Sequence, residues 1–340
     1  MLSLEATGDG GRAGLPPALM RAVRHPLAVR IGSALLTLLG VAIVIFLVLR
    51  VLPGDQVTAS LGVSAGLLTP EQKAALERYY GIGQPLPEQF ATWLGSVLTG
   101  NLGVSTIGRR PVTELVATAM PVTLELAVVA ILLGLAWGIG LGVFAASRPR
   151  GLRDGIGQVA AVAGLGIPSF VLGGGLVSFL ASAFGYFPNS RGYVSPLDDP
   201  LLNLQQVFFP ALTLSAGIGA AVLRTTRSAL LDVSRQHFVR TARGKGLSGA
   251  AVLWRHTFRN ALLPILTMSG IQFGYLLGGT VIVEQIFVLP GLGRLLLEGV
   301  GNRDYALVQS VTLLFAAGFI LVNLLVDVVY TWADPRVRLE

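Results

Sequence analysis

The chain contains no cysteine and only three histidines among its 340 residues, and only 13% of its residues are charged. Without cysteine there can be no disulfide bond and no thiolate metal site, and we predict no metal site of any kind. An ordinary soluble domain carries roughly 25% charged residues, so the composition is not that of a water-soluble protein. The net charge of +7 does not indicate nucleic-acid binding, because the basic residues are not gathered on one soluble face.

A nucleotide-binding P-loop is also missing. Such a loop ends in Gly-Lys-Ser or Gly-Lys-Thr, whereas the single Gly-Lys pair, Gly244-Lys245, is followed by glycine. Residues 62–66 fit the nucleophile-elbow pattern of hydrolases and residues 244–249 fit the dinucleotide fingerprint, but neither follows the strand that its chemistry requires. We therefore expect no enzymatic activity and no cofactor bound by this chain.

Long uncharged apolar runs are what the sequence has in abundance. A helix that crosses hydrocarbon needs about 20 apolar residues, because its backbone polar groups must be bonded within the segment. Six runs reach that length, at residues 31–49, 126–146, 155–187, 201–223, 260–283 and 305–326. The third is too long for one span, and we expect it to continue past the membrane surface. The predicted fold class is all-α, a polytopic membrane protein with six transmembrane helices.

Lysine and arginine are distributed unevenly between the connections. The N-terminal tail, the second and fourth connections and the C-terminal tail hold 17 of the 25. Since cytoplasmic loops retain positive charge, both termini are predicted to be cytoplasmic, in a multi-pass protein of the cell (inner) membrane. The expected organisation is a flexible tail (1–29), a first transmembrane helix (30–52), an extracytoplasmic segment with short helices (53–119), a core of five helices (120–332) with a cytoplasmic loop (232–260), and a C-terminal tail (333–340).

Two short helices are predicted in the extracytoplasmic segment. Residues 69–72 read Thr-Pro-Glu-Gln, a capping box with proline at the first helical position. Apolar residues then recur at helical spacing between Phe90 and Leu98. These helices are expected to form a cap packed on the outer membrane face, a docking surface for an extracytoplasmic partner, or both.

The fourth connection is the longest and most basic on the cytoplasmic side. Gly244 and Gly246 mark a turn, and Ser248 is a predicted helix start. Retention of positive charge inside the cell would explain the basic residues. It would not explain apolar Phe238 and Leu247, with Val239, in a loop that is expected to face solvent.

This loop resembles the cytoplasmic coupling loop of ABC importer permeases, most closely those for oligopeptides and dipeptides. Residues 238–248 read Phe-Val-Arg-Thr-Ala-Arg-Gly-Lys-Gly-Leu-Ser. Residues 240–242 stand where the wider family has Glu-Ala-Ala, and Gly246 stands at its glycine. The missing glutamate, and Arg259 where proline is usual, depart from the family pattern. Further stretches fit the same branch, at 52–55, 80–87, 100–105, 121–126, 167–170, 284–293 and 334–338. The long first external segment resembles the B-type member of a permease pair.

The resemblance implies a type I ABC importer permease fold and a transport subunit without its own ATPase site. It also implies partners: a related C-type permease chain, two ATPase subunits that carry ATP and Mg²⁺, an extracytoplasmic solute-binding protein, and the lipid bilayer. Closure of the ATPases around nucleotide would rock the two permease halves between inward-facing and outward-facing states. The implied substrates are dipeptides or oligopeptides, with glutathione and nickel as alternatives.

The resemblance also assigns site residues. ATPase coupling is carried over to Phe238, Arg240, Thr241, Ala242, Arg243, Lys245, Gly246 and Leu247, where glycine at 246 would permit a tight turn. Independently of the resemblance, Glu125 and Glu284 are candidates for the translocation path or a gate, because acids within spans often mark such routes. Both lie near the outer ends of their spans, where helix-end or packing roles are the simpler interpretation. A proton-coupled transporter would need acids nearer the midplane. It remains an alternative function, as does a membrane scaffold without transport activity.

Glycines also form two stripes with a spacing of four residues. Small residues at this spacing allow close contact between helices in membranes. The contact is expected either within the chain or with the second permease subunit. The stripes are Gly134, Gly138 and Gly142, and Gly270, Gly274 and Gly278.

Overall fold

The computed structural model describes residues 26–51, 69, 71, 84–106, 109–190 and 192–333. Residues 1–25 and 334–340 of the two tails, the elbow pattern at 62–66 and most of the helix expected after the capping box lie outside these residues, whereas residues 26–29, expected in the N-terminal tail, already belong to the first helix. The described chain is helical, apart from one isolated antiparallel bridge between Val104 and Pro111. The all-α fold class is therefore confirmed.

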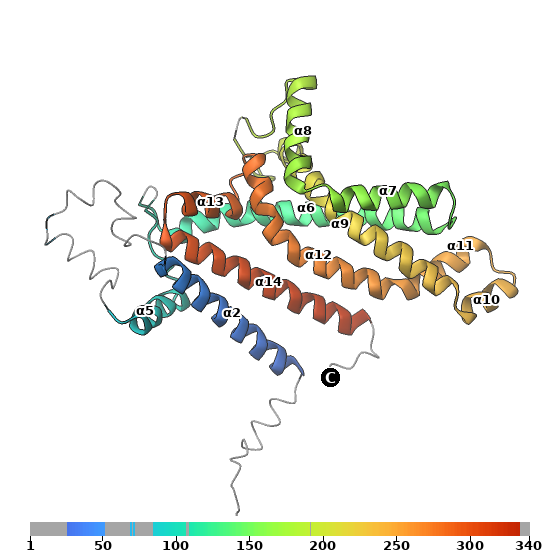
Figure 1. Ribbon diagram of the computed structural model, residues 1–340, viewed down its shortest axis with the longest axis horizontal. Coiled ribbons are helices and arrows are strands. Elements are labelled where there is room, and N and C mark those ends of the chain that lie inside the picture. The colour runs from blue at the N-terminus through green and yellow to red at the C-terminus, as the bar shows by residue number, and fades with distance from the viewer. Residues whose placement is uncertain are drawn as a thin grey trace, which may run out of the picture.

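The helices follow one another in the order shown by the colours of Figure 1. They are α2 (Pro26–Val51), α5 (Leu86–Leu98), α6 (Val112–Ala146), α7 (Leu152–Gly166), α8 (Ser169–Phe184), α9 (Pro200–Ser234), α10 (His237–Gly244), α11 (Gly249–Ala251), the π-helix η2 (Val252–Phe258), α12 (Arg259–Ile286), α13 (Leu292–Gly301) and α14 (Tyr305–Ala333). Four are long and apolar enough to cross a membrane, or up to six spans if each of two bent helix pairs counts as one.

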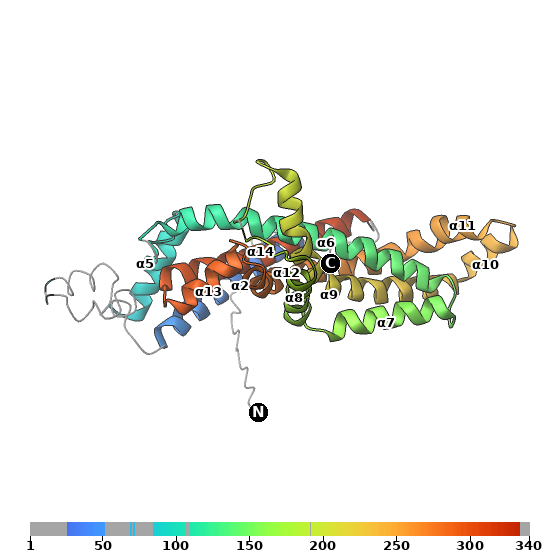
Figure 2. The same cartoon turned by 90° about the horizontal axis from the view of Figure 1, so that it is seen from above.

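The molecule is elongated, with its two ends built from different elements (Figures 1 and 2). Helices α5 and α13 lie toward one end, and α10 and α11 project at the other. The long helices run between these ends (Figure 1). Helices α6, α9 and α12 share the main hydrophobic core, and α14 packs in smaller clusters with α6 and α13 and with α2.

The first glycine stripe is used for packing within the chain. A Cβ added to Gly138 would lie 2.6 Å from the carbonyl oxygen of Gly219, and one added to Gly142 would lie 2.6 Å from Thr226 Cβ. Gly134 meets Ile218 in the same way. The stripe thus lets α6 and α9 approach closely.

The second stripe is divided. Gly270 faces Val326 and Gly274 faces Phe319, both on α14, whereas a Cβ on Gly278 would have no heavy atom within 4 Å. Two of its three glycines therefore pack within the chain, and only Gly278 leaves the space beside it open.

The third apolar run, which was expected to be too long for one span, forms two helices and not one. Helix α7 ends at Gly166 and α8 begins at Ser169, with an angle of 98° between them. Pro168 lacks a backbone N–H and disfavours helical dihedrals in the residue before it, and Ile167 is extended at φ −90° and ψ 117°. The Ile167-Pro168 pair thus gives the run a sharp bend (Figure 1).

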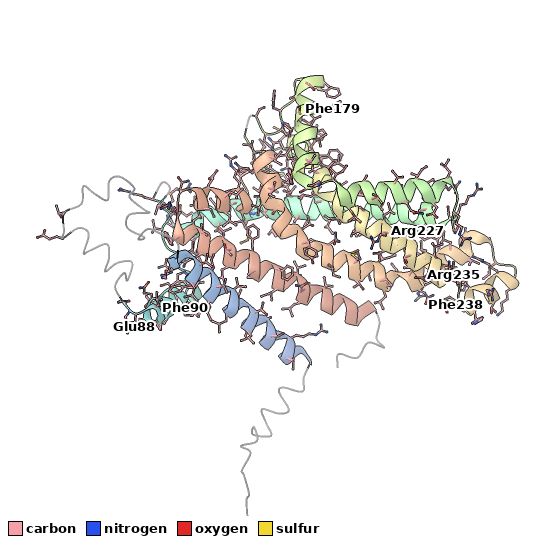
Figure 3. All side chains as sticks on the ribbon, in the orientation of Figure 1. Glu88, Phe90, Phe179, Arg227, Arg235 and Phe238 are labelled. Atoms are coloured by element: carbon pink, nitrogen blue, oxygen red, sulfur yellow. The ribbon has the colours of Figure 1, made fainter. Side chains whose placement is uncertain are left out.

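The predicted amphipathic helix of the external segment is present as α5. Phe90 lies edge-on to Phe46 of α2 at 5.2 Å, and Arg50 Nε donates a hydrogen bond of 3.0 Å to Gln89 Oε1. Figure 3 shows Phe90 on α5 beside the end of α2. The apolar face of α5 therefore packs against the end of α2. Helix α13 was not predicted from the sequence, and α6 begins at Val112, earlier than the expected boundary at 119.

Candidate functional site

The basic connection between α9 and α12 is a folded unit. Val239 and Ala242 of α10 and Val252 of η2 are buried against one another, and Val233 packs on them. This small core holds α10 against the start of the next helix. Burial therefore explains apolar Val239, which faces inward in a loop that was expected to face solvent.

The turn after α10 is a glycine-dependent helix ending. Gly246 has φ +80°, its N–H donates to the Arg243 carbonyl, and the Leu247 N–H donates to the Ala242 carbonyl. This is the Schellman pattern, in which glycine supplies the left-handed residue. Ser248 Oγ then accepts from the Ala251 N–H at 3.3 Å, so the predicted helix start is confirmed.

Seven of the eight candidate coupling residues lie on the exposed side of this unit. Phe238 is 44% exposed and Leu247 is 40% exposed, and Figure 3 places Phe238 at the far end of the molecule. The exception is Ala242, which is buried. Among the described residues, the exposed cations Arg240, Arg243 and Lys245 form no ion pair.

An eighth exposed side chain was missing from the candidate set. Trp254 on η2 is 54% exposed, and its ring centroid lies 5.0 Å from that of Phe258. A tryptophan beside two basic residues, in a loop predicted to be cytoplasmic, could have been selected by the same argument that selected Phe238. We call the exposed side chains of Phe238, Arg240, Thr241, Arg243, Lys245, Leu247 and Trp254 the coupling surface.

Glu125 of α6 is hydrogen-bonded to the connection between α8 and α9 and to the first turn of α9. Its Oε2 accepts hydrogen bonds from the Tyr193 hydroxyl and, at 3.3 Å, from Asn203 Nδ2. Gln206 bonds the same connection twice, through Gly192 O and the Val194 N–H. Burial and the hydrogen bond to Glu125 raise the pKa of Tyr193, so its hydroxyl keeps the proton that it donates.

Glu284 of α12 joins two further elements. The carboxylate is fully buried, accepts 2.8 and 3.0 Å hydrogen bonds from Thr123 Oγ1 and the Arg294 N–H, and thereby holds the first turn of α13. Thr123 also accepts from the Leu292 N–H at 2.7 Å. Gly293 is required here, since an added Cβ would lie 2.4 Å from Val281 Cα. Both acids named from the sequence thus hold connections at the end that carries α13.

A third acid at that end was not singled out from the sequence. Asp304 is fully buried and accepts from Ser105 Oγ, the Thr106 N–H at 2.8 Å and the Leu307 N–H at 3.1 Å. It caps the start of α14 and holds the bridge-forming loop before α6. An aspartate immediately before an apolar run is the ordinary signal of a helix start, and it could have been read here.

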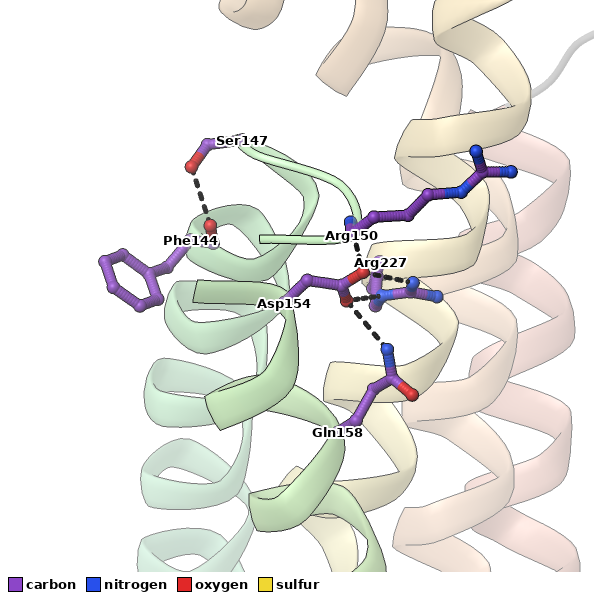
Figure 4. A network of polar contacts seen from close by, with 6 residues as sticks. All are labelled: Phe144, Ser147, Arg150, Asp154, Gln158 and Arg227. Atoms are coloured by element: carbon purple, nitrogen blue, oxygen red, sulfur yellow. Dashed lines mark hydrogen bonds and ion pairs between the residues drawn. The ribbon is translucent and has the colours of Figure 1, made fainter. Parts of the chain in front are cut away.

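A fourth acid, also missed, lies toward the end that carries α10. Asp154, in the first turn of α7, is 2% exposed and pairs with Arg227 of α9 through both carboxylate oxygens, with Nη2 at 2.9 Å (Figure 4). The Arg150 N–H at 2.8 Å and Gln158 Nε2 at 3.1 Å complete its partners. Asp154 immediately precedes the predicted third span, residues 155–187, and was therefore not counted among the charges within spans.

An open cavity of about 180 Å³ lies at the bend between α7 and α8. The two helices meet α9 and α12 there, and Thr213, Gln272 and Tyr275 add polar groups to a largely apolar lining. Glu125 and Glu284 are not among the lining residues.

Comparison with known proteins places the chain. The family model described as binding-protein-dependent transport system inner membrane component matches residues 138–339, and the N-terminal model of such components matches residues 23–127. The glutathione transport system permease protein GsiC of Pectobacterium atrosepticum is 38% identical over 302 residues, which are 89% of this chain and 95% of that protein. A putative peptide transport system permease of Brucella abortus is 40% identical over 311 residues, covering 92% and 98%.

A solved structure shares the fold. The inward-facing MetNI methionine ABC transporter superposes with a TM-score of 0.52 at 16% identity, over 65% of this chain and 97% of the matched chain. The chain therefore has the fold of an ABC transporter permease, as was expected from the sequence. The chain belongs to the family of binding-protein-dependent transport system inner membrane components, as a permease subunit that is not itself catalytic.

Proposed function

We propose that this chain is the B-type transmembrane subunit of an importer for dipeptides or oligopeptides, which an extracytoplasmic binding protein delivers. A related C-type permease would complete the passage, and two ATPase subunits, which hold ATP and Mg²⁺, would drive alternating access. Glutathione is the second candidate substrate, because a relative that is 38% identical carries that name. The observation that carries the proposal is the coupling surface, which joins exposed apolar side chains to cations that have no ion-pair partner among the described residues, at one tip of the molecule.

The chemistry of the coupling surface suits a protein partner. Phe238, Leu247 and Trp254 expose apolar area that would gain free energy by leaving water, and aromatic residues are typical of energetically important interface positions. Arg240, Arg243 and Lys245 would steer and orient an acidic groove on the partner. The buried Ala242 and Val239 fix the shape of this surface before the partner arrives, which lowers the cost of ordering it on binding.

The cavity at the bend suits one half of a translocation path. It opens to the surface of this chain, with Tyr275 71% exposed at its edge, and a second permease covering that opening would enclose a passage between the two chains. Glu125 and Glu284 would serve this passage indirectly, by fixing the connections at the α13 end that close it. Their hydrogen bonds favour this role over the proton relay of a secondary transporter.

The function is tested by reconstitution. The chain is purified with the permease and ATPases that accompany it, placed in liposomes with the binding protein, and assayed with a dipeptide, a pentapeptide, glutathione and Ni²⁺. We expect ATP-dependent accumulation of a peptide. Failure of any ATPase to copurify would overturn the proposal, and loss of uptake on adding an uncoupler, with ATP still present, would favour the proton-coupled alternative.

The membrane orientation is tested separately. Both termini and the coupling surface are proposed to be cytoplasmic, and the connection between α8 and α9 extracytoplasmic. Because the chain has no native cysteine, single substitutions report cleanly. Leu197→Cys, at a position that is 93% exposed, should react with an impermeant maleimide from outside the cell, and Thr241→Cys should react only after permeabilisation. The opposite pattern would reverse the topology.

A further inference from the structure

Helix α7 is held to the bundle by one of its faces. Its other face is exposed and apolar, with Leu152, Val159 and Val162 each 70% exposed or more. On the packed face the contacts are made by the smallest residues. An added Cβ on Gly157 would lie 2.6 Å from Ala145 Cβ, and one on Gly164 would lie 2.7 Å from the Ala216 carbonyl oxygen. The helix therefore lies on surfaces with little relief.

Such contacts bring backbones close but do not fix how far one helix has slid or turned against another. Interlocking of large side chains normally sets that register, and glycine and alanine have none to offer. The pair between Asp154 and Arg227 supplies a bidentate contact at the first turn of α7, and two parallel N–H···O bonds fix direction as well as distance. Figure 4 shows the carboxylate enclosed by donors from α7, from α9 and from the preceding turn.

The pair is not well explained as a source of stability. Desolvation of two charges commonly cancels their attraction, and apolar residues of similar volume often support a fold equally well. Asp154 nevertheless has all four of its hydrogen bonds supplied, and the Arg227 side chain is 25% exposed. A site so completely satisfied, in a helix otherwise seated on glycine and alanine, indicates that position is what the pair determines.

The two partners lie on the route between the coupling surface and the cavity. Arg227 is in the last part of α9, which ends at Ser234 and leads directly into α10. Asp154 begins α7, whose far end, with Gly164 and Ile167, lines the cavity at the bend. A displacement of α10 can reach the bend through α7 only if α7 moves together with the last part of α9.

We propose that Asp154 and Arg227 form a register lock, a contact that prevents α7 from sliding or turning against the last part of α9. The two helix segments then move as one rigid body, which transmits displacement of the coupling surface to the cavity at the bend. Both are positioning residues, since neither touches a substrate. The inference rests on the proposed function for its role in coupling. The register itself is a property of this chain alone.

The test separates register from stability. Spin labels at Val159→Cys on α7 and Arg235→Cys at the end of α9 report the distance between the helices by double electron–electron resonance. The complex is measured in nanodiscs, nucleotide-free and trapped with ATP, Mg²⁺ and vanadate. The variant is the apolar double substitution Asp154→Leu with Arg227→Met. Arg224→Met, which removes a neighbouring cation of α9, is the matched control.

In the parent and in Arg224→Met we expect one narrow distance distribution that is the same in both states. The apolar double variant should assemble, unfold at the parent temperature or above and hydrolyse ATP at the parent rate. Its distribution should broaden, and trapping should shift it. A narrow, unshifted distribution in the double variant would overturn the proposal, and so would failure of that variant to assemble, since the pair would then be needed for folding. If no ATPase copurifies, the proposed function fails, and the nucleotide-free distribution still decides whether the register lock exists.

Discussion

The two ends of the molecule use charge in opposite ways. At the end that carries α13, the charged groups that organise the structure are acids, and Glu125, Glu284 and Asp304 each bond a different connection. At the end that carries α10, the buried pair of Asp154 and Arg227 also organises the structure, but the coupling surface carries exposed cations that, within the described chain, form no ion pair. The acids at the α13 end have their hydrogen-bond partners within the chain, whereas the cations of the coupling surface are free to contact another protein.

The difference follows from what each charge costs. A buried carboxylate without donors would be strongly unfavourable, so an acid persists in the interior only where backbone and hydroxyl donors surround it. An exposed arginine or lysine costs little and contributes little to folding. Substitutions at the α13 end should therefore change the free energy of unfolding, whereas substitutions on the coupling surface should change only the association with the ATPases.

The largest effect on stability is expected for Glu284→Ala. It removes the acceptor for Thr123 Oγ1 and the Arg294 N–H and leaves both donors buried, which should cost roughly 3 kcal/mol. Thermal unfolding of the purified complex, followed by tryptophan fluorescence, measures this. The control is Glu298→Ala, which breaks a partly exposed pair with Arg294 and should cost less than about 0.5 kcal/mol. Equal losses in the two variants would contradict the assignment of Glu284 as the buried fastening.

A smaller loss is expected for Gly293→Ala. The added methyl would lie 2.4 Å from the backbone of Val281, and overpacking of this kind costs about 1–3 kcal/mol. Gly301→Ala, in the same helix, meets nothing within 4 Å and should be tolerated. Comparison of the two melting curves isolates the close approach of α13 to α12. Tolerance of both substitutions would mean that α13 is not seated as described.

At the coupling end, Gly246→Asp should leave the melting curve of the bundle almost unchanged and abolish uptake. The left-handed backbone there costs a residue with a Cβ about 1–2 kcal/mol locally, and the new carboxylate lies among cations that are proposed to meet an acidic groove. ATP hydrolysis and uptake by the reconstituted complex are measured together. Gly244→Ala is the control, since Gly244 has neither a positive φ nor a near neighbour. Normal uptake by Gly246→Asp would remove this turn from the coupling mechanism.

The sequence predicted those parts of the molecule that follow from solvent and local backbone chemistry. Apolar length identified the spans, the helix start at Ser248 was confirmed, and a tight turn was predicted at Gly244 and Gly246. Each of these depends on a few consecutive residues. Glycine stripes could be found in the same way, but whether they face another helix of the chain or another subunit depends on the fold.

The sequence did not reveal contacts between distant residues. Asp154 lies 73 positions from Arg227 and Ser105 lies 199 from Asp304, and no periodicity connects them. The bend at Pro168 was missed for a related reason, since an apolar run reads the same whether it crosses the membrane once or turns within it. Helix α13 was missed because its first turn is held by Glu284 and Thr123 from other helices.

The same contrast between buried and exposed side chains is found within α10, where neighbouring residues face opposite ways. Val239 is fully buried in the small core of the loop, and Phe238 beside it is 44% exposed. Val239→Ala removes apolar atoms worth about 1.5 kcal/mol at roughly 0.8 kcal/mol per buried carbon. Phe238→Ala removes a side chain that is nearly half exposed and lies outside the small core of the loop, and it should change the unfolding free energy by less than about 0.5 kcal/mol.

Association with the ATPases should invert that order. Phe238→Ala deletes an aromatic contact from the proposed interface and should weaken copurification of the ATPase subunits, by about 1 kcal/mol or more if Phe238 is among the few dominant contacts. Val239→Ala should change binding only as far as it loosens α10. Titration of purified ATPase onto the permease in nanodiscs, beside melting curves for both variants, gives the two quantities. If Phe238→Ala bound the ATPase as the parent does, the exposed apolar face of α10 would have to serve something other than coupling.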